Sequence, residues 1–220
     1  NLDSAYFCQV KDKTGKIIYR LPNHHFDIKA TSPGRGTIVL LGGVIDYGEI
    51  NRNLFWIRPN YVDTVYSTSD WTDVRPYYII QRNNRAADYA WSVRMKVGDI
   101  TREDAEREQL CNVYALKSGL LFNYLFNPKQ QGAGFCPANG KSKTISRLFK
   151  NDIDSYCPSI DLWQAIAYKT LYQKEDYLYL LIDAFKFFEE GAKPPFPDLT
   201  EDSNPVLVKL KLKNGKRRYV

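Results

Sequence analysis

Short segments of alternating apolar and polar residues run through the first half of the chain and predict β-strands. Residues 6–10 and 17–20 flank a polar turn, a pattern typical of a β-hairpin. Other runs rich in β-branched and aromatic residues predict strands at 37–41, 54–58, 61–67, 77–82 and 90–97. We therefore expect a strand-rich, mostly antiparallel N-terminal half covering about 6–97.

The period of the pattern changes after Gly98. Thr101 is followed three residues later by Asp104, a weak form of the capping box that begins a helix. Apolar residues then recur at helical spacing as far as residue 125, before Asn127 and Pro128. This spacing predicts one long helix over about 101–126, or a helix broken at Gly119.

Shorter helices are expected at 142–150, 159–172 and 175–190, the last carrying an apolar stripe. Apolar residues alternate with lysines over 206–212 and predict a half-exposed strand, where the lysines discourage edge pairing. The predicted fold class is α+β, with a helical C-terminal half at about 101–190 and a C-terminal strand. We expect residues 1–220 to form a single domain.

The composition fits a globular protein with an aromatic and basic character. Hydrophobic residues make up 44% of the chain, 16 residues are Tyr, and the net charge is +6. This charge favours anionic partners such as nucleic acid, anionic lipid or nucleotide phosphate, although a slight excess of lysine explains it equally. No apolar run approaches the roughly 18–20 residues of a membrane-spanning helix, so no transmembrane segment is expected.

The four cysteines indicate whether the protein is secreted or stays in the cytoplasm. Cys136 and Cys157 bracket a polar segment and are expected to form one disulfide, which leaves Cys8 with Cys111. Such bridges favour a secreted protein; the alternative is four free thiols in a cytoplasmic protein. The spacing of the cysteines and histidines fits no zinc motif, so no metal is expected.

Three polar motifs follow one another along the first half of the chain. Arg20 ends a predicted strand as Tyr-Arg, residues 67–69 read Ser-Thr-Ser, and Glu106 and Glu108 form a Glu-x-Glu. In this order the set resembles the Arg, Ser-Thr-Ser, Glu-x-Glu class of mono-ADP-ribosyltransferase toxins of the cholera and pertussis type. The segments 19–36 and 77–89 are similar to stretches of the same family.

The resemblance implies a secreted toxin or effector that uses NAD as co-substrate and transfers ADP-ribose to a protein or nucleic-acid acceptor. Arg20 would grip the pyrophosphate through charge-assisted bonds, with Ser69 beside it. Glu108 would stabilise the oxocarbenium-like centre as nicotinamide leaves, Ser67 would orient it, and Glu106 would activate the acceptor.

Two other functions remain open. His24 and His25 are the only histidines and sit in a predicted loop, where they could serve an RNA-binding or RNA-cleaving protein. In that protein, lysines would contact phosphates and tyrosine rings would stack on bases. The third hypothesis is a non-enzymatic structural or interaction protein, such as a capsid or effector component.

Overall fold

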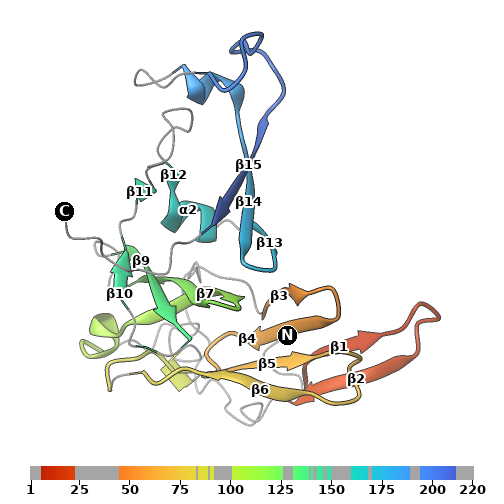
Figure 1. The fold of residues 1–220 in the computed structure, drawn as a ribbon. Helices are drawn as coiled ribbons and strands as arrows, with labels where there is room; N and C mark the ends of the chain where they lie inside the picture. Colours follow the sequence, from red (N-terminus) through yellow and green to blue (C-terminus); the bar gives the residue numbers. More distant parts are fainter. Residues whose placement is uncertain are drawn as a thin grey trace.

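The protein is described by a computed structural model. It describes residues 6–22, 45–82, 84–88, 90–91, 101–125, 131–138, 140, 143–145, 148–149, 160–167, 170–188 and 194–211. Strands dominate these residues, and all the strand pairs are antiparallel (Figure 1).

The N-terminal half contains a hairpin and a four-stranded sheet. The hairpin consists of β1 (Tyr6–Lys11) and β2 (Ile17–Pro22). The sheet follows chain order and consists of β3 (Ile45–Asn51), β4 (Leu54–Pro59), β5 (Thr64–Thr68) and β6 (Arg75–Ile79).

The second half begins with the short 3-10 helix η1 (Asp104–Glu106) and continues into a central sheet. In spatial order that sheet consists of β10 (Lys143–Ile145), β9 (Gln131–Pro137), β8 (Gly119–Leu125) and β7 (Gln109–Leu116). Next come the small pair β11 (Leu148–Phe149) and β12 (Ile160–Asp161), and then α2 (Leu162–Ala167). The described chain ends with a three-stranded sheet of β13 (Tyr172–Lys174), β14 (Tyr177–Ile182) and β15 (Val206–Lys211). The 3-10 helix η2 (Ala184–Phe187) lies between β14 and β15 in the chain.

The central sheet is buried on both faces. Val113 and Ala115 of β7 pack with Trp56 and Val65 of the N-terminal sheet in one apolar cluster. The alternate residues of β7 and β8, including Tyr114, Leu116 and Leu121, pack on the other side against α2 and the β13–β14–β15 sheet. The central sheet is therefore the middle layer of the core, and both outer sheets rest on it.

Burial on both faces explains why the long helix predicted at 101–126 is wrong. A strand covered on both sides needs apolar residues at nearly every position, so it loses the period of two. Residues 109–125 instead form the hairpin β7–β8, and Gly119 stands at its turn with φ +148°. A Cβ on Gly119 would lie 2.1 Å from the carbonyl oxygen of Cys136, so glycine is required there.

The other predicted helices are also mostly strands, so the α+β class with a helical C-terminal half is wrong. Residues 143–145 and 148–149 are strands within the predicted helix at 142–150. Among the described residues of the segment 159–172 only those of α2 are helical, and the described part of the segment 175–190 contains β14 and η2. Among the described residues of the C-terminal half, α2 is the only α-helix in a fold dominated by β-sheets.

Several predicted strands are confirmed. The hairpin of β1 and β2 forms as expected, and Oδ1 of Asp12 accepts bonds from the backbone N–H of Thr14 (2.8 Å) and Lys16 (3.0 Å) across its turn. The strands expected at 54–58, 61–67 and 77–82 correspond to β4, β5 and β6, and the C-terminal strand is β15. The strand expected at 37–41 and most of the one expected at 90–97 lie outside the described residues, and the two described residues of the latter, Ala90 and Trp91, are helical rather than extended.

The cysteine prediction needs correction. Cys8, Cys111 and Cys136 carry free thiols, so the expected Cys8–Cys111 bridge is not formed and Cys136 is unbonded. Cys157, its expected partner, lies outside the described residues. Cys111 is buried in β7, where it packs as a small apolar side chain.

Candidate nucleic-acid interface

The arginine and serines singled out from the sequence lie in two different sheets. Arg20 is exposed on β2, and its guanidinium carbon lies 5.2 Å from the centre of the Tyr6 ring. Ser67 is on β5, opposite Trp56 and Arg75 in the neighbouring strands, and Ser69 follows that strand at the surface.

The two glutamates precede the central sheet. Glu106 is the last residue of η1, and Glu108 lies in extended chain, where its backbone N–H donates to the carbonyl oxygen of Arg85 (2.9 Å) and its carbonyl oxygen accepts from Ala87 (2.8 Å). The Glu-x-Glu is therefore not in the middle of a helix. A shared NAD site for Arg20 and Glu108 stays a prediction, and His24 and His25 lie outside the described residues.

Thr101 and Asp104 form the predicted capping-box interaction, but it precedes one turn of 3-10 helix. The Thr101 hydroxyl donates to Oδ2 of Asp104 (3.0 Å), and the Asp104 N–H donates back to that hydroxyl oxygen (3.1 Å). The indole N–H of the buried Trp91 donates to the Asp104 carbonyl oxygen (3.0 Å). This cluster fixes the chain just before Glu106 and Glu108.

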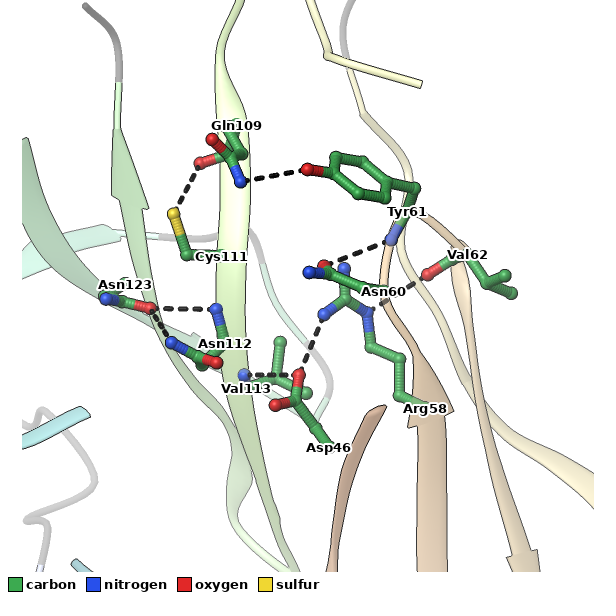
Figure 2. Close-up of polar contacts among 10 residues, drawn as sticks. All are labelled: Asp46, Arg58, Asn60, Tyr61, Val62, Gln109, Cys111, Asn112, Val113 and Asn123. Carbon is green, nitrogen blue, oxygen red and sulfur yellow. Dashed lines mark hydrogen bonds and ion pairs between the residues drawn. The ribbon is translucent and has the colours of Figure 1, made fainter. Parts of the chain in front are cut away.

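A buried polar network joins the N-terminal sheet to the central sheet (Figure 2). Nη1 of Arg58 lies 3.0 Å from Oδ2 of Asp46, and both side chains are almost completely buried. The same carboxylate oxygen accepts the backbone N–H of Val113 on β7 (3.1 Å), and Nε of Arg58 donates to the carbonyl oxygen of Val62 (3.1 Å). The ion pair therefore links β3 and β4 to the middle layer.

A β-bulge lies at the other end of this network. Leu110 pairs with Tyr124 and Val113 with Phe122, so two residues of β7 face the single residue Asn123 of β8. The side-chain oxygen of Asn123 accepts the backbone N–H of Asn112 (2.9 Å) and so replaces a ladder bond that the bulge removes (Figure 2).

Burial keeps two groups of the network, the Cys111 thiol and the Tyr61 hydroxyl, in their neutral forms. Burial raises the pKa of the Cys111 thiol to about 12, despite the opposing effect of the nearby Arg58. Burial also raises the pKa of Tyr61, whose hydroxyl accepts a bond from the Gln109 side-chain amide (3.2 Å). A buried thiol with a raised pKa is unreactive, so this network is suited to structure rather than to nucleophilic chemistry.

The outer face of the β13–β14–β15 sheet carries tyrosines and lysines in two cross-strand rows. The first row is Lys174, Tyr177 and Lys211, and the second is Tyr172, Tyr179 and Lys209. Directly paired residues of neighbouring strands point to the same side of a sheet, so these six side chains share one surface. We call it the tyrosine–lysine face.

The alternation within the sheet keeps this face apart from the core. Leu178, Leu180 and Ile182 of β14 point inward and are buried in the main apolar cluster. The tyrosines between them, Tyr177 and Tyr179, are partly exposed, and Tyr172 on β13 is 62% exposed. In Figure 1, β14 and β15 extend away from the central sheet.

Rings and cations lie within interacting distance on the tyrosine–lysine face. Nζ of Lys209 is 3.8 Å from the centre of the Tyr177 ring and 5.9 Å from that of Tyr179. Nζ of Lys211 is 5.5 Å from the Tyr177 ring, and the rings of Tyr172 and Tyr179 are 6.3 Å apart. The six residues carry three positive charges and no carboxylate.

Sequence reasoning found one strand of this face and missed the other two. The alternating lysines of β15 predict a half-exposed strand correctly. The tyrosines of β14 fall within the segment 175–190, which is expected to form a helix with an apolar stripe. The available signal was the period of two in 177–182, which puts both tyrosines on one side and Leu178, Leu180 and Ile182 on the other.

Within the described ranges, no three His, Cys, Asp or Glu side chains gather in a way that could hold a metal ion. No helix in this part of the chain is both long enough and apolar enough to cross a membrane.

Comparisons of the chain with protein-family models, with curated proteins and with solved structures found no significant match.

Proposed function

We propose that the protein binds single-stranded nucleic acid, and RNA in particular, on the tyrosine–lysine face. One observation carries this proposal: three tyrosines and three lysines form two adjacent rows on the outer surface of an antiparallel sheet. Proteins that bind single strands combine aromatic rings, on which bases stack, with cations that follow the phosphates. Sheet surfaces with exposed aromatic residues serve the same purpose in RNA-binding modules.

The spacing of the rings suits consecutive bases. Tyr177 and Tyr179 are two residues apart on β14, which corresponds to about 6.7 Å along a strand. Bases that are unstacked from one another can each lie on one ring at this separation. Lys209 and Lys211 on the edge strand β15 then lie beside the path of the sugar–phosphate backbone.

The lysine–tyrosine contacts do not prevent base stacking. A cation–π contact at an exposed site contributes about 0.5–1 kcal/mol, whereas stacking a base on an aromatic side chain contributes about 1–3 kcal/mol. A base therefore displaces the ammonium group of Lys209 from the Tyr177 ring. The displaced ammonium group gains a phosphate partner. The lysine–tyrosine contact of the free protein is therefore replaced by two stronger contacts, a base stacked on the ring and a lysine on a phosphate.

Fluorescence anisotropy with a labelled oligo-uridine of about twelve nucleotides tests the proposal. At low salt we expect saturable binding, and replacing both Tyr177 and Tyr179 with Ala should weaken it at least tenfold, since each lost stack costs about 1 kcal/mol or more. Replacing both with Phe keeps the rings and should preserve most of the affinity. Tyr47→Ala is the matched control, because Tyr47 is an exposed tyrosine on β3.

The salt dependence tests the role of the lysines separately. Three phosphate contacts predict a slope of log K against log salt of about −2 for a single strand, and replacing Lys209 and Lys211 with Gln should bring it to about −0.7. Lys117→Gln, in the turn between β7 and β8, should leave the slope unchanged. Absence of binding at low salt, or equal affinity of the double-Ala variant, would refute the proposal.

A further inference from the structure

A pocket of about 210 Å³ lies where the β1–β2 hairpin meets the N-terminal sheet. Three aromatic rings line it: Phe7 on β1, Tyr19 on β2 and Tyr66 on β5. Apolar side chains complete the wall, from Leu21, Pro22, Pro59 and Val62. None of the lining residues is charged.

The buried ion pair holds two lining residues of this pocket, Pro59 and Val62, in place. Pro59 and Val62 bracket the turn between β4 and β5, and the Val62 N–H donates to the Pro59 carbonyl oxygen (3.2 Å). Nε of Arg58 donates to the Val62 carbonyl oxygen (3.1 Å), and Asp46 holds the same guanidinium. Tyr61 within the turn has φ +63° and lies against the ring of Trp91 (6.1 Å between centres).

Tyr19, another lining residue, packs against an aromatic neighbour. The ring of Tyr19 lies 6.0 Å from that of Trp71, between their centres. Burial raises the pKa of Tyr19, and the neighbouring Cys8 and Tyr66 raise it further. The Tyr19 phenol therefore stays neutral beside the apolar wall.

We infer that this pocket binds a neutral aromatic ring system of about the size of indole. A cavity of about 150 Å³ lined by apolar side chains accommodates benzene, so 210 Å³ suits a group one fused ring larger. Rings that meet edge to face or in offset stacks are favourable partners for Phe7, Tyr19 and Tyr66. A charged group is disfavoured, because the wall supplies no countercharge to offset its desolvation.

This site is independent of the proposed nucleic-acid interface. Its residues lie on β1, β2, β4 and β5 and in the turn after β4, whereas the tyrosine–lysine face belongs to β13, β14 and β15. The aromatic group can come from a free small molecule or from a tryptophan side chain of a peptide, and both present the same neutral bicyclic ring.

Ligand-observed saturation-transfer NMR with free indole at millimolar concentration tests the inference on the whole chain. We expect saturation transfer to indole, with binding at least tenfold weaker in Val62→Trp, which fills the pocket, and in Tyr66→Leu, which removes one ring. Tyr47→Trp adds an exposed ring on β3 and should leave binding unchanged. Circular dichroism checks that each variant is folded, and Tyr66→Leu keeps the test decisive if Val62→Trp does not fold.

Two further probes define the ligand. Indole-3-acetate carries a carboxylate and should bind at least tenfold more weakly than indole, while N-acetyl-tryptophanamide should bind as indole does if the source is a peptide side chain. If only free indole binds, the source is a small molecule. Absence of saturation transfer to indole, or equal binding by wild type, Val62→Trp and Tyr66→Leu, would overturn the inference.

Discussion

The indole N–H of Trp56 donates to the side-chain oxygen of Gln173, 3.1 Å away and 117 positions further along the chain. The amide nitrogen of Gln173 donates in turn to the carbonyl oxygens of Glu49 (3.1 Å) and Ala115. Trp56 and Glu49 belong to the N-terminal sheet, Ala115 to the central sheet and Gln173 to β13. One buried side chain therefore connects three sheets.

Replacing Gln173 with Leu should lower the free energy of unfolding by about 3 kcal/mol. The substitution keeps the volume but leaves a buried indole N–H and two carbonyl oxygens without their partner, and each unmade buried bond costs about 1–3 kcal/mol. Urea denaturation measures the change. Gln9→Leu, at an exposed position of β1, is the matched control and should shift stability by less than about 0.5 kcal/mol.

The Asp46–Arg58 pair gives a second prediction. Asp46→Ala removes the acceptor of both Arg58 and the Val113 N–H, and it leaves a fully buried guanidinium without its countercharge. Breaking a buried pair in this way costs about 3–5 kcal/mol. The double variant Asp46→Leu with Arg58→Met removes both charges and should be more stable than Asp46→Ala alone. Calorimetry or urea denaturation measures the stability of wild type and of the two variants. If Asp46→Ala unfolds like wild type, the buried pair does not have the stabilising role expected of it.

Cys111 predicts an alkaline loss of stability. Its folded thiol keeps its proton until the pH reaches its pKa of about 12, whereas an unfolded thiol ionises near 8.5. Above 8.5 the unfolded state binds fewer protons, so stability is complete below that pH and falls as the pH rises towards 12. Between pH 8.5 and 10 wild type should lose about 1.5 kcal/mol more than Cys111→Ala. Equal losses in urea titrations of the two proteins would contradict this expectation.

Two glycines of β9 lie beneath aromatic rings of β8. A Cβ on Gly134 would lie 2.3 Å from Cζ of Phe122, and one on Gly132 would lie 2.5 Å from Oη of Tyr124. Gly134→Ala forces the Phe122 ring to move within the core and should cost about 1–3 kcal/mol. Gly140→Ala is the control, because its nearest neighbour would be Pro137 at an ordinary 3.5 Å. Thermal unfolding of both variants distinguishes a steric effect from a general effect of removing glycine.

Local patterns predicted some, but not all, of the elements that have one face in water. The β1–β2 hairpin and β15 follow from alternation and turn residues because one side of each strand is exposed. β7 does not, because its alternate residues enter two different apolar clusters and its sequence reads as a continuous run. Because this continuous apolar run also fits helical spacing, the segment that forms the β7–β8 hairpin is predicted as a helix.

The polar sites were harder to predict because their partners are far apart in sequence. Asp46 and Arg58 are 12 positions apart, and the acceptors of Gln173 in β3 and β7 are 124 and 58 positions away. Nothing in the local sequence shows which of the many polar residues will meet. Only part of the tyrosine–lysine face could be predicted, because the alternating lysines of β15 are evident in the sequence. The tyrosines join them only through the pairing of β14 with β13 and β15.

Alternation along β14 separates the residues that hold the fold from those that meet the surroundings. Leu178, Leu180 and Ile182 pack inward, while Tyr177, Tyr179 and Leu181 point outward. Exchanging an exposed residue away from special features usually changes stability by less than about 0.5 kcal/mol. The outward positions can therefore be substituted one at a time while the fold persists, so natural drift or deliberate design can change the chemistry of this surface without unfolding the protein.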